Sequence, residues 1–306
     1  MATFGRASYD AARYASIRPT YPQELFRVVF DYHRANNPSP RWGTAVDLGC
    51  GTGQATRQCT PFERIIGVEP SAKMLEQARK VPRPAELKGT LDYVQSPAEE
   101  LPFLEDSSVD LILSAQAAHW FDWNKLWREA ARVLRPDGTL AVWGYSEFRL
   151  TNYPSATPLI NEYSQGTDPK SSLGPYWERP GRSILDNHLL DIPRPQNVVP
   201  GQFHSFQHLF FRGKHHDHLP AEQSKPVLLQ KTVTWEGLLD YFYTFSSFHT
   251  FQQQNPEDSK HPEGDIAVRF WKALQAHVSE ESGGKIATSD EIQIEWPIAL
   301  IMAKRS

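Results

Sequence analysis

The stretch Val46-Asp47-Leu48-Gly49-Cys50-Gly51-Thr52-Gly53-Gln54 decides the fold of this chain. Its first residues end an apolar strand, and its three glycines predict a sharp turn that can approach a ligand closely. The helix expected after the turn would present its free N–H groups there. The dinucleotide fingerprint needs a further glycine at position 54, where this chain has Gln54. That departure disfavours an NAD-dependent oxidoreductase.

Two acidic residues around this turn indicate what it binds. Glu69 lies 20 positions after Gly49 (69 − 49), at the end of the next strand-like segment. A carboxylate at that distance bonds the ribose hydroxyls of an adenosine group. Asp47, just before the turn, suits a ligand with a positive amine better than a pyrophosphate. A ligand with an adenosine end and an amino-acid end satisfies both residues, and S-adenosylmethionine has that shape.

The first half of the chain alternates strands and helices. Strand-like segments cover 44–48, 64–68, 91–95, 109–114 and 139–145, and helix-like segments cover 20–32, 71–80 and 123–134. The segment 109–114 is nearly all apolar, as expected for a strand covered on both faces. This alternation predicts an α/β fold with a doubly wound, mostly parallel sheet.

The second half is less regular and richer in turn residues. We expect helices near 176–190, at 234–251 and at 266–278, a strand at 203–211 and a closing strand at 292–302. Pro297 inside the closing strand suggests an edge or a bulge. The expected organisation is an N-terminal lid and first helix (1–40), a cofactor-binding core (41–145), and a substrate cap with the closing strands of the same sheet (146–306).

Composition excludes several classes of protein. The 306 residues carry a formal net charge of −4, which argues against a general nucleic-acid binder. No stretch approaches the roughly 20 apolar residues of a membrane span, and the start lacks the apolar core of a secretory signal. The two cysteines, Cys50 and Cys59, are too few for a disulfide framework. We therefore expect a cytoplasmic protein without nucleic-acid or membrane partners; its oligomeric state cannot be read from the sequence.

Several motifs together resemble a known family. V-D-L-G-C-G-T-G, V-E-P-S, A-E-E-L-P-F and L-R-P-D-G-T-L, all within 44–145, are similar to the class I S-adenosylmethionine-dependent methyltransferases. A second set looks like the fungal trans-aconitate methyltransferase group: R-Y-A-S-I-R-P-T-Y-P (13–22), A-H-W-F-D (118–122), W-G-Y (143–145), G-P-Y-W-E-R-P-G-R-S (174–183) and K-P-V-L-L-Q-K (225–231). The resemblance implies a seven-stranded Rossmann-like sheet with a helical cap. It also implies methyl esters of small carboxylic acids as products, with S-adenosyl-L-homocysteine released.

The resemblance also implies a set of cofactor-binding residues. They are Asp47, Gly49, Gly51, Gly53, Glu69, Pro70, Ala98, Glu99 and Gln116, with Tyr14 and Arg18 folding over the cofactor. Pro97 stands where the family often has an adenine-binding Asp. Adenine is therefore expected on the backbone around Ala98 and on Glu99.

The group of the substrate that accepts the methyl determines whether the reaction needs a general base. A carboxylate is ionised at neutral pH because its pKa lies near ~4, so it needs no base, and His119 would then be an orienting donor. A hydroxyl group on a secondary metabolite would need a base, and His119 is then the candidate. Both readings stay open: a carboxyl O-methyltransferase, or a hydroxyl O-methyltransferase with His119 as general base.

A small di- or tricarboxylic acid also needs cationic and apolar partners. Arginine pairs bidentately with carboxylates, which makes Arg179 and Arg182 the candidate anchors. The expected pocket walls are Trp120, Trp143, Tyr145, Tyr176 and Trp177.

Other readings are weaker. His215-His216-Asp217-His218 has no spaced partner histidine, so no metal site is expected. A nucleic-acid methyltransferase is disfavoured because Ser114-Ala115-Gln116-Ala117 stands where an N-P-P-Y-like segment would follow the fourth strand. A binding module that has lost catalysis is disfavoured because no motif is visibly broken.

Overall fold

The chain forms two compact units, each assembled from separate segments. The computed structural model describes residues 17–35, 37 and 39–306. Unit 2 contains Thr20–Ser146, Ser183–Leu228 and Pro297–Ser306, and unit 1 contains the chain up to Pro19, Glu147–Arg182 and Leu229–Trp296. The helix expected at 20–32 and the last strand therefore belong to the same unit as the glycine-rich turn.

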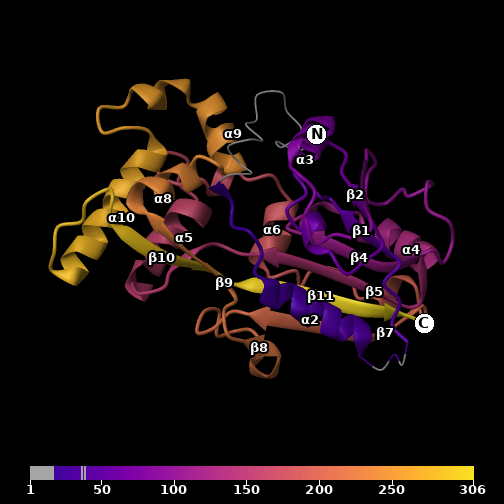
Figure 1. Cartoon of the computed structure of the whole chain (residues 1–306). Coiled ribbons are helices and arrows are strands. Elements are labelled where there is room, and N and C mark those ends of the chain that lie inside the picture. Colours follow the sequence, from indigo (N-terminus) through magenta and orange to yellow (C-terminus); the bar gives the residue numbers. More distant parts are fainter. Residues whose placement is uncertain (1–16, 36, 38) are drawn as a thin grey trace. The chain divides into compact units, whose positions relative to one another are not determined.

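Unit 2 is built on an eight-stranded sheet (Figure 1). Its order is β3-β2-β1-β4-β5-β11-β7-β8. The bounds are β1 Thr44–Leu48, β2 Arg64–Val68, β3 Thr90–Val94, β4 Val109–Ala115, β5 Leu134–Tyr145, β7 Phe203–Phe211, β8 Ser224–Lys225 and β11 Ile298–Arg305. The first five strands are parallel, and β11 runs antiparallel to both β5 and β7. The predicted doubly wound α/β class is confirmed, and the two-residue β8 adds one strand to the seven expected.

Helices cover both faces of this sheet because its central strands are apolar on both faces. Leu140 and Val142 of β5 join the buried cluster under α4 (Trp123–Val133), whereas Trp143 packs against Phe26 of α2 (Gln23–Arg34) on the opposite face. The remaining helices of the unit are α3 Ala72–Lys80, α6 Gly181–Asp186 (which begins in unit 1), α7 Pro195–Val198, and the 3₁₀ turns η2 Thr56–Gln58, η3 Ala118–Trp120 and η6 Ala221–Gln223.

Unit 1 combines a small antiparallel sheet with helices. The sheet order is β6-β10-β9, with β6 Arg149–Leu150, β10 Glu291–Trp296 and β9 Leu229–Thr234. The helices are α5 Thr157–Gln165, α8 Trp235–Phe242, α9 Ser246–Gln254 and α10 Ile266–Ser282, with 3₁₀ turns η4 Pro154–Ala156, η5 Gly174–Tyr176 and η7 Pro256–Lys260. Its core is aromatic: Tyr163 stacks on Phe270 with ring centroids 3.9 Å apart, and Phe242 packs against both rings.

Four expectations about elements are corrected. Pro297 ends one strand and precedes another, so 292–302 is not a single strand: β10 and β11 belong to different sheets, and β11 is internal. The helix expected at 234–251 is two helices, α8 and α9. The helix near 176–190 is limited to η5 and α6. The glycine-rich turn leads into η2, a single 3₁₀ turn, and not into a regular helix. None of the described helices is long and apolar enough to cross a membrane.

Candidate active site

The carboxyl ends of β1, β2 and β4 bring the predicted cofactor residues to one edge of the unit 2 sheet. Leu48 pairs with Val68 in register, and β4 runs parallel on the other side of β1. Strand order therefore reverses between β1 and β4, the point at which open α/β sheets bind ligands. Gly49, Glu69 and Gln116 directly follow these three strands.

The three glycines of the turn are needed for different reasons. Gly49, Gly51 and Gly53 have φ of 66°, 54° and 78°, a left-handed region that favours glycine. A Cβ on Gly49 would lie 2.5 Å from the Ala117 side chain, and one on Gly53 would lie 2.4 Å from the Tyr93 hydroxyl. A Cβ on Gly51 would meet nothing within 4 Å. Two glycines thus permit close packing, and the space at Gly51 suits a bound ligand.

Tyr93 is a residue that the sequence analysis missed. Its ring lies where a Cβ on Gly67 or Gly53 would be, so these two glycines make room for it. Arg57 Nη1 donates to the Tyr93 hydroxyl at 3.4 Å and to the carbonyl of Thr52 at 3.0 Å. This contact braces the turn from β3. The glycine inside β2 was the available signal, because an internal strand glycine often marks a close approach.

Glu69 is held in place by the backbone around the site. Its Oε2 accepts the N–H of Gly51 at 3.1 Å, and its Oε1 accepts the N–H of Ser71 at 3.0 Å. Burial raises the pKa of Glu69, and these two hydrogen bonds oppose the rise. Each carboxylate oxygen has two lone pairs, so a carboxylate fixed in this way can also accept the two hydroxyls of a ribose.

Asp47 is buried directly beneath the turn. Thr56 Oγ1 donates to its Oδ2 at 2.6 Å, whereas Oδ1 is buried and has no hydrogen-bond partner among the described residues. Burial raises the pKa of Asp47 to about 7. An unsatisfied buried carboxylate oxygen is costly, and a ligand ammonium group would satisfy it.

Gln116 joins the ends of two strands. Its side-chain amide pairs with the backbone of Tyr145, accepting from the N–H at 2.6 Å and donating to the carbonyl at 3.1 Å. Gln116 has φ of 60°, an uncommon conformation for a side chain of this type. The side chain therefore fixes the edge formed by β4 and β5, and Tyr145 is held through its backbone.

The segment after β4 carries the candidate base. His119 lies in η3 and is 8% exposed, its ring 4.9 Å from that of Trp120, which is 37% exposed. Glu99 Oε1 accepts the N–H of Asp122 at 2.7 Å, at the start of α4. The Glu99 carboxylate is thus already engaged, while Ala98 is buried in the neighbouring core.

Three predicted aromatic wall residues are held in place by contacts within their own units. Trp143 is fully buried between Tyr21 and Phe26, so it is a core residue of unit 2 and not a pocket wall. Tyr176 donates its hydroxyl to the Pro169 carbonyl at 2.8 Å and is likewise buried. The indole of Trp177 donates to the Ser164 carbonyl at 2.7 Å. Tyr14 lies outside the described residues.

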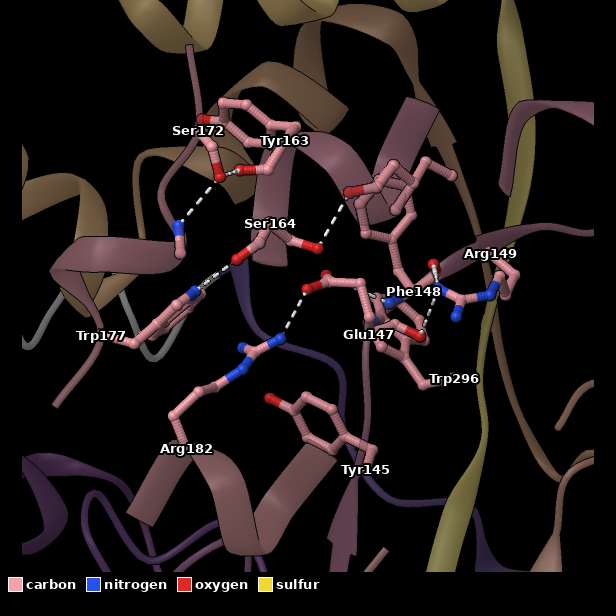
Figure 2. Close-up of polar contacts among 12 residues, drawn as sticks. Tyr145, Glu147, Phe148, Arg149, Tyr163, Ser164, Ser172, Trp177, Arg182 and Trp296 are labelled. Atoms are coloured by element: carbon pink, nitrogen blue, oxygen red, sulfur yellow. Dashed lines mark hydrogen bonds and ion pairs between the residues drawn. The ribbon is translucent and has the colours of Figure 1, made fainter. Parts of the chain in front are cut away.

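The three arginines predicted to bind the substrate or the cofactor lie in different environments. Arg179 is exposed. Arg182 is buried at 8% exposure, and its Nη2 donates to Oε2 of Glu147 at 2.9 Å (Figure 2). Its guanidinium lies over the Trp177 ring, 4.1 Å from the centroid. Arg18 lies over Tyr241 and Phe245 and donates to the Thr244 carbonyl at 3.2 Å.

The sheet order and the edge built from Gly49 to Gln116 define a class I methyltransferase fold. A methyltransferase domain model matches residues 46–142. The yeast (Saccharomyces cerevisiae) "Probable S-adenosylmethionine-dependent methyltransferase CRG1" is 33% identical over 87% of this chain and 88% of its own length. "Methyltransferase pgmE" of Aspergillus terreus is 26% identical over 95% of this chain and 92% of its own. "The Structure of a Putative Type II Methyltransferase from Anaeromyxobacter dehalogenans" covers 94% of this chain and 97% of its own at 26% identity, with a TM-score of 0.65.

This chain belongs to the S-adenosylmethionine-dependent methyltransferases. Its residues fit that cofactor: the carboxylate of Glu69 faces the turn, Asp47 has an unsatisfied oxygen, and the space beside Gly51 is open. The relatives do not single out the trans-aconitate group, so the substrate class is a proposal.

Proposed function

We propose that the protein methylates a carboxylate oxygen of a small di- or tricarboxylic acid, such as one resembling trans-aconitate. The observation that supports this is the buried Arg182 on the Trp177 ring. Arg182 already pairs with Glu147 at 2.9 Å, so a substrate carboxylate would share the guanidinium with Glu147. Arginine is the side chain that recognises carboxylates bidentately.

Arg18 is the second candidate anchor in unit 1. The Phe245 ring connects the two arginines, because it lies 5.6 Å from Trp177 and 5.4 Å from the Arg18 guanidinium. We name Arg18, Arg182, Trp177, Tyr241 and Phe245 the arginine–aromatic cluster. Two cations on one aromatic cluster suit a ligand with more than one carboxylate. Arg18 therefore becomes a substrate-binding candidate in addition to the cofactor role expected from sequence.

Methyl transfer to a carboxylate requires little of the protein beyond positioning the two reactants. S-adenosylmethionine supplies a methyl group on a sulfonium, which is a good leaving group. An ionised carboxylate needs no proton removed, so the residues of this chain have to align the acceptor and exclude water. Gln116 holds the edge between β4 and β5 in shape, and His119 beside it acts as an orienting donor.

A hydroxyl acceptor is the second candidate, because His119 lies at the sheet edge and retains slight exposure. The pH dependence of kcat separates the two. For a carboxylate, kcat should stay flat above the pKa of the substrate. An ascending limb near ~6.5 that disappears in His119→Ala would instead establish His119 as the base for a hydroxyl.

The decisive experiment is a methyl-transfer screen over small carboxylic acids with mass detection of the ester, followed by variants. Arg182→Lys keeps the charge but loses the planar fork, so it should raise KM for a diacid by about tenfold or more, or at least about 1.4 kcal/mol. It should change KM for the matching monoacid far less. Arg179→Lys, at the exposed arginine three positions earlier, is the matched control and should leave both values unchanged.

Two results would count against the proposal. Equal penalties for diacid and monoacid would show that Arg182 does not read the second carboxylate. No ester from any carboxylic acid in the screen, together with intact S-adenosylmethionine binding, would move the acceptor to another chemical class while leaving the family assignment untouched.

A further inference from the structure

Three histidines from two separate loops of unit 2 come together. His188 lies in the turn after α6, and His216 and His218 lie in the loop between β7 and η6. One ring nitrogen of each lies within 4.8 Å of the others. The rings of His188 and His216 are 4.2 Å apart between centroids. From sequence, the run at 215–218 had no spaced partner; the fold supplies one from outside the run.

We propose that His188, His216 and His218 bind one divalent transition-metal ion of the zinc class. Imidazole nitrogen is a preferred ligand of such ions, and three histidines with water in the fourth position are a common zinc arrangement. At Zn–N distances of about 2.0–2.1 Å, tetrahedral ligand nitrogens lie about 3.3 Å apart. The three rings would close by up to about 1.5 Å, which side-chain rotations can supply.

The loop that carries two of the ligands is held by one buried guanidinium. Arg212 donates to the His215 carbonyl at 2.6 Å, to Ser224 Oγ at 2.8 Å and to Asp217 Oδ1 at 3.1 Å. Asp217 lies between the two ligand histidines in the sequence. Its carboxylate is held by the ion pair with Arg212, at the start of the same loop. These contacts fix the chain on both sides of His216 and so position the loop that carries two of the ligands.

Backbone strain accompanies the cluster. His188, Leu189 and His216 have φ of 51°, 62° and 55°, a left-handed conformation that is unfavourable for a residue with a side chain. His208 Nε2 donates to the His188 carbonyl at 3.0 Å and holds that turn from β7. Strain of this kind concentrates at functional sites, and here it falls on two of the three ligand residues.

The cluster adjoins the sheet edge of the candidate active site. Leu189, next to His188, lies 3.8 Å from where a Cβ on Gly144 would be, and the Gln116 side chain lies 3.5 Å from the same point. A bound metal would therefore fix the turn that packs over the end of β5. The site contributes no predicted cofactor residue, so it can be tested separately from methyl transfer.

The test is metal binding by the full-length protein, without a polyhistidine tag and stripped with a chelator. Titration with Co²⁺ alone, followed by its visible absorption, and with Zn²⁺ alone, followed by calorimetry, should give one equivalent per chain. His218→Ala and His216→Ala should each weaken binding at least about tenfold, because they remove a direct ligand. His215→Ala, one position before His216, and His261→Ala, in unit 1, should bind as the wild type does.

His218 is exposed, so its replacement should leave folding intact, and thermal unfolding without metal checks this. At equal concentration, Zn²⁺ should raise the melting temperature of the wild type and of His215→Ala more than that of His218→Ala. Absence of stoichiometric binding in the wild type would overturn the proposal. So would unchanged affinity in His216→Ala and His218→Ala.

Discussion

Asp47 is the buried carboxyl group whose ionisation should control cofactor affinity. Burial raises its pKa from 3.8 to about 7, so the group is protonated in the free protein below that pH. Only the ionised form pairs with a ligand ammonium. Affinity for S-adenosylmethionine should therefore fall by up to about tenfold between pH 7 and pH 6. Calorimetry across pH 5.5–7 measures this.

The same group also affects the stability of the free protein. A carboxyl whose pKa is raised on folding binds more protons in the native state, so its contribution to stability declines as pH rises from about 4 to 7. Asp47→Asn should flatten both the binding and the melting profiles. Asp31→Asn, at an exposed carboxylate of α2, is the control and should leave both slopes in place. Persistence of the slopes in Asp47→Asn would assign them to another group.

Gly51 and Gly283 provide a matched pair for testing the open space in the turn. Both have positive φ, 54° and 69°, and a Cβ on either would meet nothing within 4 Å. Alanine at each position should cost a similar ~1–2 kcal/mol of stability, because the strain is similar. Only Gly51→Ala should also lose S-adenosylmethionine affinity, since its methyl group enters the cofactor space. Equal cofactor affinity in the two variants would place the ligand elsewhere.

At the scale of elements, β11 and α2 are joined by a buried lysine. Lys304 Nζ donates to the carbonyls of His33 and Ala35 at the end of α2, and burial lowers the pKa of Lys304. Helix ends leave such carbonyls without helical partners. Lys304→Met should destabilise the protein by about 1.5–3 kcal/mol in denaturant unfolding, because charged hydrogen bonds are lost.

The control for that substitution is Lys80→Met, which removes an exposed pair with Glu76 on α3. Water screens exposed pairs of this kind, so the unfolding midpoint of Lys80→Met should barely move. A midpoint for Lys304→Met equal to that of Lys80→Met would show that water satisfies the end of α2 in place of Lys304.

Local signals predicted elements well where the residues act on their own neighbours. The helices expected from positions 71 and 234 begin there, because the side chains of Ser71 and Thr234 cap α3 and α8, and the apolar segment 109–114 lies in β4. The chain alone did not reveal that Pro297 separates two strands of different sheets, because the partners of β10 and β11 are distant in sequence. For the same reason His188 could not be matched with His216 before the fold was known.

In the candidate site, too, residues fixed by local sequence were predictable, whereas residues that depend on partners distant in sequence were not. Glu69 and the glycines were predictable because spacing along one strand–turn–strand segment fixes them. The roles of Gln116 and Trp143 were not, since they depend on Tyr145 across the sheet and on Phe26 from α2. Of the two arginine candidates in one short segment, only the fold distinguishes the buried Arg182 from the exposed Arg179.

At the scale of the whole molecule, the last ten residues complete a unit that begins at Thr20. β11 pairs with β5 from Ile298 opposite Tyr145 to Lys304 opposite Thr139, and with β7 on its other side. Without it, β5 and β7 would lose their shared neighbour, and the end of β5, which Gln116 holds, would be unsupported. Removal of 297–306 should therefore abolish cooperative unfolding of unit 2 and S-adenosylmethionine binding, although the whole glycine-rich turn remains.

Circular dichroism, thermal unfolding and calorimetry with S-adenosylmethionine measure that outcome. Removal of Ser306 alone is the control, because it leaves β11 intact and should retain both the transition and the binding. Unit 1 keeps its complete β6-β10-β9 sheet in the shortened chain, so helical and sheet signals should persist in part. Cofactor binding by the chain that ends at Trp296 would show that the parallel strands alone maintain the site, and that β11 is dispensable for it.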